Sequence, residues 1–280
     1  MQKSLTREVG IIIFKAVTVV VTIVLVIVSI NYFYEIESSV GDGFCNVAVL
    51  PIEGTILPFY GLVDAPLVVT PEMVETFMDT VEEQGDIDAV LIEINSPGGT
   101  PVASQRIAQR LRNSPLPSVG LIGDIGASGG YMVAIATDYL IASPMSTVGS
   151  IGVTMSYVEN SKQNDEDGLT YVELNTGKFK NSGDPNKPLT DEERAVFQRD
   201  LDILHTEFVN MVALYRNKPV EEVRTLADGS TMTGGRALEN GLIDAVGGRA
   251  EARTAFAKIL NTNEADVRFC EYESSLIPFY

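Results

Sequence analysis

The chain has 280 residues, of which 45% are apolar and 8% aromatic, with 24 glycines; this suits one or two α/β domains with many short turns. Its formal charge of −18 at pH 7 repels phosphate backbones and argues against nucleic acid as a partner. The single histidine and the two cysteines, 225 positions apart (270 − 45), form no Cys/His cluster, so we expect neither a zinc-type metal site nor a cofactor.

The first predicted element is an apolar segment from Val9 to Ile30. It holds 22 residues with a single charge, Lys15, and as a helix it would span about 33 Å, enough for the hydrocarbon core of a bilayer. The run is too long for the apolar region of a cleaved signal peptide. It therefore predicts one uncleaved transmembrane helix, with a buried core helix as the alternative.

Basic residues precede this segment and glutamates follow it, which predicts a cytoplasmic amino end. Residues 1–40 would then hold the cytoplasmic tip, the membrane anchor and a linker, and residues 41–280 one domain on the other side of the membrane. An extracytoplasmic space is oxidising, so Cys45 and Cys270 could form a disulfide there. Two unrelated thiols are the alternative.

Strands and helices alternate through the next hundred residues. One predicted strand, 88–95, is almost continuously apolar, as expected when both faces of a sheet are covered. Thr70 is placed to cap a helix whose first residue is Pro71. The alternation predicts an α/β core with parallel strands. The predicted strands are 46–52, 88–95, 118–122 and 139–142, and the predicted helices are about 70–84, 101–112 and 131–136.

The second half of the chain is more polar. Strands are expected at 152–158 and 170–174, separated by an acidic segment, 161–168, that lacks the ligand pattern of a calcium loop and is better explained as a solvated turn. The capping box Thr190-Asp-Glu-Glu193 opens a long amphipathic helix that reaches about residue 217. Shorter helices are predicted at 220–226, 234–239 and 248–260.

One turn carries a candidate nucleophile. Ser128 lies between a β-type run and an apolar helical run, where the first N–H groups of the helix lack partners within it. Flanking glycines would let another backbone approach closely. A hydroxyl beside such donors can act as a nucleophile with part of an oxyanion hole. From this stretch alone, an ordinary Gly-Ser turn that caps a helix is the commoner explanation.

A serine nucleophile needs a base. The turn matches the G-x-S-x-G pattern, which requires an aspartate and then a histidine downstream. The only histidine, His205, falls in the middle of a predicted helix, whereas catalytic histidines usually lie on loops. We therefore expect His205 to be an interface or partly buried surface residue. Lysine is then the remaining candidate for the base. It can serve when burial lowers its pKa toward neutrality.

Five groups of motifs resemble the signal peptide peptidase A family, the membrane-anchored Ser–Lys proteases of the S49 group. The resemblance covers about residues 46–250 and implies a ClpP/crotonase-like α/β fold. The motifs are Asn95-Ser-Pro-Gly-Gly99, Gly126-Ala-Ser-Gly-Gly-Tyr131, Ser143-Pro144 with Thr147-Val-Gly-Ser-Ile-Gly-Val153, Thr176-Gly-Lys-Phe-Lys180, and Ala227-Asp-Gly229 with Gly235-Arg-Ala237 and Gly241-Leu-Ile-Asp244.

The resemblance assigns roles to five residues. Ser128 is similar to the nucleophile and Lys180 to the general base of the family. Ser150 matches the position whose hydroxyl helps to hold the lysine amine. The backbone N–H groups of Gly98 and Gly129 would form the oxyanion hole. Without the resemblance, Ser150 could be a simple turn serine and Lys180 a solvated loop lysine.

Lys178 and Lys187 lie close to Lys180 in the sequence, and only the Thr-Gly-x-x-Lys spacing of the family selects Lys180. The resemblance further implies a serine endopeptidase of the bacterial inner membrane that degrades cleaved signal peptides and short hydrophobic peptides. Its catalytic domain would be periplasmic or otherwise extracytoplasmic. The resemblance also implies a homo-oligomer in which Ser128 and Lys180 meet across neighbouring protomers. The apolar tail from Ser275 to Tyr280 is a candidate occupant of a neighbour's groove, against simple packing or disorder.

Two alternatives share the fold. A crotonase-like acyl-CoA enzyme would use the glycine oxyanion hole and leave Ser128 without a role. An external location that lacks coenzyme A argues against this alternative. A non-catalytic membrane scaffold is the second alternative.

Overall fold

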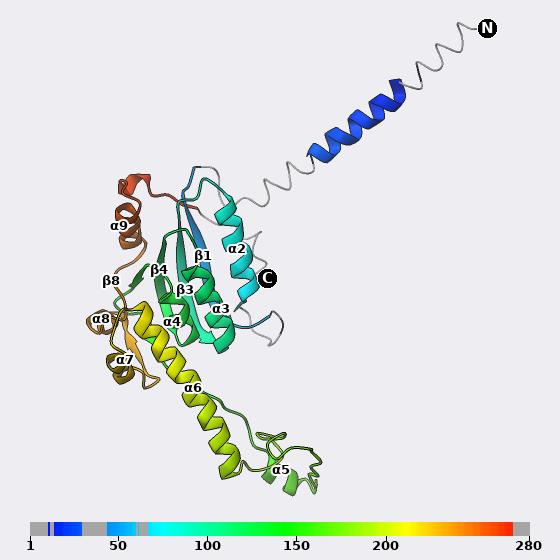
Figure 1. Ribbon diagram of the computed structural model, residues 1–280, viewed down its shortest axis with the longest axis vertical. Coiled ribbons are helices and arrows are strands. Elements are labelled where there is room, and N and C mark those ends of the chain that lie inside the picture. The colour runs from blue at the N-terminus through cyan, green and yellow to red at the C-terminus, as the bar shows by residue number, and fades with distance from the viewer. Residues whose placement is uncertain (1–10, 12–13, 30–43, 60, 62–66, 271–280) are drawn as a thin grey trace, which may run out of the picture.

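The computed structural model describes residues 11, 14–29, 44–59, 61 and 67–270 (Figure 1). Its centre is a parallel sheet in the order β2-β1-β3-β4-β5-β8. Three more strands pair with this central sheet. β9 is parallel to β1, β6 is parallel to β4, and β7 is antiparallel to β6. The predicted α/β class with a parallel core is confirmed. The strands are β1 (Val47–Ile56), β2 (Val68–Val69), β3 (Ala89–Gly99), β4 (Ser118–Ala127), β5 (Tyr139–Ala142), β6 (Thr147–Gly149), β7 (Thr231–Thr233), β8 (Ala245–Val246) and β9 (Phe269–Cys270).

Helices cover both faces of this sheet, which explains the continuous apolar strands. In β1, Leu50 and Ile52 pack into a core with α2, α3 and α4, whereas Val47 and Val49 pack into a second core with α9. Successive side chains of a strand point to opposite faces, so each strand serves both cores. The helices are α2 (Pro71–Glu83), α3 (Pro101–Arg112), α4 (Gly129–Ala134), α7 (Val220–Leu226), α8 (Gly234–Glu239) and α9 (Arg249–Ile259).

Two helix starts agree with their sequence signals. The Thr70 hydroxyl accepts from the N–H of Met73 at 3.3 Å, at the start of α2. At the start of α6 (Asp191–Tyr215), the Glu193 N–H donates to Thr190 Oγ1 at 3.2 Å, and the Thr190 N–H donates to Glu193 Oε2 at 2.9 Å. These reciprocal bonds satisfy two backbone donors that the helix itself cannot pair. The predicted capping box is confirmed.

The segment 152–190 differs from its prediction. The expected strands at 152–158 and 170–174 are not formed, and the expected turn contains a short exposed helix, α5 (Ser161–Glu166). This segment and the first half of α6 form an arm that projects from the body (Figure 1). β6 is already paired on both sides, so the arm meets no free strand there to extend. Its apolar side chains are exposed; Val158, Val172 and Leu174 are 76%, 74% and 94% accessible.

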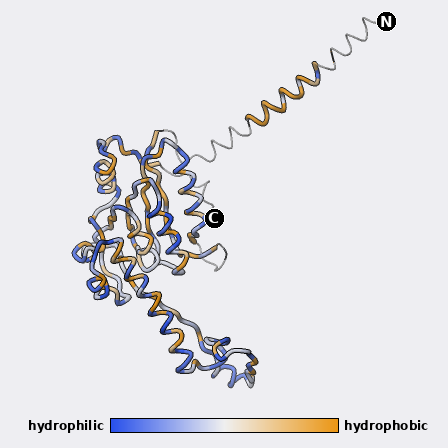
Figure 2. Tube along the Cα trace, in the orientation of Figure 1, coloured by the Kyte–Doolittle hydropathy of each residue, from blue (hydrophilic) through white to orange (hydrophobic). Residues whose placement is uncertain are grey.

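Near the amino end, residues 14–29 are helical, and Figure 2 shows this stretch as mostly apolar, with Lys15 its one charged residue. Val9 and Ile30, the predicted limits of the membrane segment, lie outside the described residues. Within the described ranges, no helix combines the length and apolarity needed to cross a bilayer. The tail from Ser275 to Tyr280 also lies outside the described part of the chain.

Cys45 and Cys270 are joined in a disulfide. The bond ties the start of β1 to the end of β9, where Val47 and Ala48 pair with Phe269 and Cys270. The sequence did not decide between a disulfide and two unrelated thiols, and the structure shows the disulfide.

Candidate active site

Ser128 occupies a sharp turn between β4 and α4. Its φ of 51° and ψ of −122° lie outside the regions that most non-glycine residues adopt, a conformation that persists only when neighbouring contacts hold it. The contacts come from β6, because Ala127 pairs with Gly149 and the Ser128 N–H donates to Gly149 O at 2.8 Å. Ser128 is half-buried. The turn thus fixes this hydroxyl beside the first N–H groups of a helix.

Gly98 packs directly against this turn. It has a φ of +102°, and a Cβ added there would lie 2.6 Å from Gly129 N and 2.9 Å from Ser128 Cβ. Only glycine allows this approach. In this structure the Gly98 N–H donates to Ser96 Oγ at 3.1 Å. The two glycines assigned to the oxyanion hole therefore adjoin Ser128, and the Gly98 N–H is engaged with Ser96.

Ser128 opens into a pocket of about 460 Å³ that Ser150 also lines. Ser150 is held at the end of β6 by its own N–H, which donates to Ser230 O at 2.9 Å. The pocket has both apolar and acidic walls. Its other lining residues are Gly152, Val153, Thr154, Met155, Gln198, Leu201, Asp202, His205, Ala227, Asp228 and Gly229.

His205, on α6, lines the same pocket. The sequence predicted an interface or partly buried surface residue at this position and not a site residue. The side chain is half-buried, and its Nε2 atom is buried with no hydrogen-bond partner in the described part of the molecule. A buried nitrogen without a partner is costly, typically about 1–3 kcal/mol. The position in mid-helix concealed this placement, because no local pattern tells which helix face meets the end of β4. The only signal was that the chain has one histidine.

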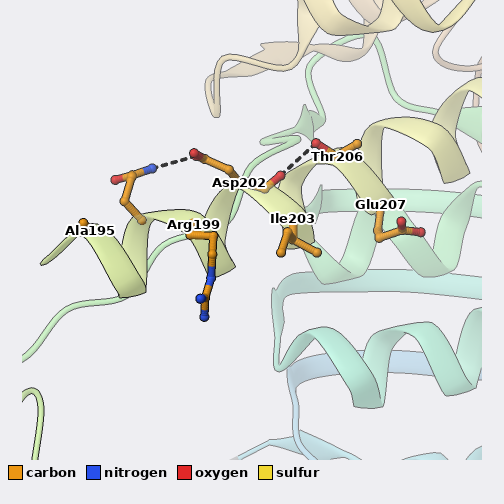
Figure 3. Close-up of a pocket in the computed structure, with 7 residues that line it drawn as sticks. Ala195, Arg199, Asp202, Ile203, Thr206 and Glu207 are labelled. Carbon is orange, nitrogen blue, oxygen red and sulfur yellow. Dashed lines mark hydrogen bonds between the residues drawn. The ribbon is translucent and has the colours of Figure 1, made fainter. Parts of the chain in front are cut away.

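The same helix borders a second hollow of about 660 Å³, lined by seven α6 residues between Ala195 and Glu207 (Figure 3). Asp202 lines both hollows. Figure 3 shows its carboxylate accepting from Gln198 Nε2 at 2.7 Å and its carbonyl accepting from Thr206 Oγ1 at 2.8 Å. α6 therefore contributes residues to both hollows.

Lys180 lies on the arm, in a turn closed by its N–H, which donates to Gly177 O at 2.9 Å. Its side chain is exposed and does not line the Ser128 pocket. Ser128 belongs to the body and Lys180 to the projecting arm, so a single chain does not bring the two residues together (Figure 1).

The neighbouring lysines are engaged in ion pairs. Lys178 Nζ lies 2.6 Å from a carboxylate oxygen of Glu192. Lys187 Nζ lies 2.8 Å from Glu173 and 3.1 Å from Glu193. Hydrogen bonds to Glu173 and Glu193 raise the pKa of Lys187 to about 12, which makes it a poor general base at neutral pH. Among the described residues, Lys180 has no carboxylate partner, so it is the lysine of this cluster that remains available.

Comparisons with known proteins match this sequence to a peptidase family. The profile of peptidase family S49 matches residues 110–263, which include Ser128, Ser150 and Lys180. A protein of Enterococcus faecium named for signal peptide peptidase SppA is 31% identical over 73% of this chain and 60% of its own length. The chloroplastic serine protease SPPA of Arabidopsis thaliana is 29% identical over 74% of this chain and 31% of its own length.

Protease 4 of Haemophilus influenzae is 29% identical over 78% of this chain and 35% of its own length. The chain spans at most about three fifths of each of these three relatives. The family profile covers more than half of the chain and includes the strained serine turn and the arm. The chain belongs to peptidase family S49, in the signal peptide peptidase A group.

Proposed function

We propose that this protein is a serine endopeptidase in which Ser128 is the nucleophile and Lys180 of a neighbouring protomer is the general base. The strained turn at Ser128 is the observation that carries the proposal, because it presents a half-buried hydroxyl in a pocket beside Gly98 and Gly129. Strain of this kind persists where surrounding structure enforces it, and it concentrates at active sites. An acyl-CoA enzyme or a scaffold would have no need for this serine geometry.

The reaction follows from the groups around Ser128. The neutral Lys180 amine takes the proton of Ser128 Oγ as that oxygen bonds to a peptide carbonyl carbon. The carbonyl oxygen becomes an oxyanion, which the Gly129 N–H stabilises, together with the Gly98 N–H once it exchanges its bond to Ser96. The oxyanion then re-forms the carbonyl as the peptide C–N bond breaks, and the protonated lysine gives its proton to the departing amine, which leaves the acyl-enzyme. Water, deprotonated by the same lysine, hydrolyses the acyl-enzyme and releases Ser128.

The position of Lys180 supports a homo-oligomer. The arm carries exposed apolar side chains at Val158, Val172 and Leu174, and such surfaces commonly mark protein contacts. If the arm of one protomer packs on the body of the next, Lys180 can enter the pocket that holds Ser128 and Ser150. The Ser150 hydroxyl would then accept from the lysine ammonium and position it. Burial in this contact would lower the lysine pKa toward the working range of a base.

The proposed substrates are cleaved signal peptides and other short hydrophobic peptides. The pocket offers apolar walls at Val153, Met155 and Leu201 for a substrate side chain. We propose that residues 1–40 anchor the chain in the bacterial inner membrane and that residues 41–280, with a ClpP/crotonase-like fold, act on its extracytoplasmic side. The disulfide between Cys45 and Cys270 supports an oxidising compartment.

A second base is favoured by one observation. His205 lines the Ser128 pocket within one chain, and its Nε2 atom has no partner among the residues described. A neutral imidazole there could take the serine proton without a neighbouring protomer. The two bases predict different assemblies, so they can be separated.

The proposal is tested with a fluorophosphonate, which labels an activated serine. We expect rapid labelling of the full chain in membranes, with mass spectrometry locating the tag on Ser128. Ser128→Ala and Lys180→Ala should each abolish labelling and cleavage of a signal peptide, while Lys178→Ala, the matched control on the arm, should retain both. If labelling survives in Lys180→Ala and is lost in His205→Gln, the general base is His205 and not Lys180. If the wild-type protein is not labelled, the proposal that it is a serine endopeptidase is contradicted.

A further inference from the structure

A cluster of arginines lies away from the Ser128 pocket, on the α9 side of the body. Arg249 and Arg253 on α9 and Arg268 before β9 line a hollow of about 460 Å³ together with Phe269. We call this hollow the arginine pocket. The chain has only 20 basic residues against 38 acidic ones, so three arginines around one hollow depart from the general charge of the surface.

Two of the three guanidinium groups have no carboxylate partner in the described structure. Arg249 forms a two-point ion pair with Glu93, at 2.6 and 2.9 Å. The Arg253 guanidinium instead lies over the ring of Phe269, 5.4 Å from its centre. Arg268 is exposed and donates to a backbone carbonyl at 3.4 Å. Arg253 and Arg268 thus form no ion pair within the described part of the chain.

One carboxylate, Glu264, also lines the arginine pocket and accepts from Thr254 Oγ1 at 2.8 Å. It lies in η1 (Glu264–Asp266) and is exposed. Counting Arg253 and Arg268 against Glu264, the pocket keeps a net positive charge. An anion with several acceptor oxygens matches this arrangement, because guanidinium groups bind phosphate through parallel hydrogen bonds.

The arginine pocket lies beside the entry of the amino-terminal segment into the body. The N–H groups of Asn46 and Val47 both donate to Arg268 O at 3.0 Å, and the Arg268 guanidinium donates to the carbonyl of Phe44. The Phe44 side chain is 75% exposed. Figure 1 shows α9 toward one end of the body, whereas the arm projects from the opposite end.

This location decides which charges a membrane would meet. At physiological ionic strength, charges act over about 8 Å, so a surface at this end senses the local arginines and not the carboxylates of the arm. Phenylalanine is among the apolar residues that interfacial segments bury at the boundary between headgroups and acyl chains. Arginines beside an aromatic residue are the combination that recognises anionic lipid surfaces.

We propose that the arginine pocket binds the phosphate of an anionic phospholipid headgroup and thereby orients the body on the bilayer. The inference rests on the proposed membrane anchoring and is independent of the catalytic residues. It predicts that the body lies with η1 and α9 against the lipid and with the arm directed away from it. An acidic domain without this contact would be held off an anionic surface by its own charge.

The test uses the full chain reconstituted in vesicles of phosphatidylcholine, with or without phosphatidylglycerol. A fluorophore is attached at Ala250→Cys, in the wall of the arginine pocket; the native cysteines are disulfide-bonded and do not react. A quencher on the lipid headgroups reports contact. We expect quenching only with phosphatidylglycerol, and less of it at high salt.

Each arginine near an anionic surface strengthens the binding constant about five-fold. Arg253→Glu with Arg268→Glu should therefore weaken the contact about 25-fold or more, whereas Arg224→Glu, the same charge change on α7, should leave it intact. Thermal unfolding of each variant checks that the fold is kept.

The outcomes separate the two proposals. Protein that fails to float with either kind of vesicle would overturn the anchor. Protein that floats with both, but whose fluorophore is never quenched, would overturn the headgroup contact and leave the anchor standing. Loss of quenching with inorganic phosphate, but not with sulfate at equal ionic strength, would support recognition of the phosphate group by the arginine pocket. Quenching that is unchanged in Arg253→Glu with Arg268→Glu would overturn the proposal, because the contact would then not depend on these arginines.

Discussion

A mixing experiment tests the separation of Ser128 from Lys180. The structure places the serine in the body and the lysine on the arm, so the proposed site takes one residue from each of two protomers. A chain with Ser128→Ala still supplies a lysine, and a chain with Lys180→Ala still supplies a serine. We expect neither variant to be active by itself, whereas an assembly that contains both would hold some complete sites.

The expected magnitude follows from counting contacts. In a ring each body meets one neighbouring arm, so random mixing of equal amounts completes about a quarter of all sites. We therefore expect roughly a quarter of wild-type peptidase activity after the two variants are dissociated in detergent and reassembled together. Fluorophosphonate should then label only the Lys180→Ala chain, which the mass difference of a tag distinguishes.

The control is a mixture of Ser128→Ala with a double Ser128→Ala/Lys180→Ala variant, which should stay inactive because no chain supplies the serine. If co-assembly is shown by cross-linking and the first mixture remains inactive, the cross-protomer site is refuted. If Lys180→Ala is fully active before mixing, the base lies elsewhere, and His205 becomes the residue to test.

Three further predictions follow from single contacts. Gly98→Ala would bring a Cβ within 2.6 Å of Gly129 N, so we expect peptidase activity to fall about a hundredfold, as for loss of an oxyanion donor, with circular dichroism unchanged. The pKa of Glu193 is lowered to about 2, chiefly by the backbone N–H of Thr190, from an ordinary value of 4.5. Because the folded pKa is depressed, this group's stabilisation is present above pH 4.5 and is lost as the pH falls toward 2. The protection of amides at the start of α6, taken as the exchange rate relative to the intrinsic rate at each pH, should therefore fall over that interval, and much less so in Glu193→Gln. Cys45→Ser should lower the free energy of unfolding by about 2–4 kcal/mol in urea titrations, with equal stability of reduced wild type and variant as the check.

Local patterns were sufficient to predict much of the body. The apolar run at 88–95 and the caps at Thr70 and Thr190 depend on hydrogen bonds and burial within a few residues, and the structure forms these elements. The arm was mispredicted for the opposite reason. Residues 152–158 and 170–174 have strand-like composition, but a strand also needs a partner edge, and the edges of β6 are taken. The availability of that edge is set by strands distant in sequence.

The amino-acid sequence by itself determined that Ser128 lies at a strand-to-helix turn and that glycines surround it, because both follow from local backbone preferences. Only the tertiary structure decided that Gly98 packs on that turn, that His205 shares its pocket and that Lys180 does not. Gly98 lies 30 positions before Ser128 in the sequence (128 − 98), and His205 lies 77 positions after it (205 − 128). No short-range pattern encodes which helix face or loop reaches the end of β4, since the packing of the whole sheet sets that geometry.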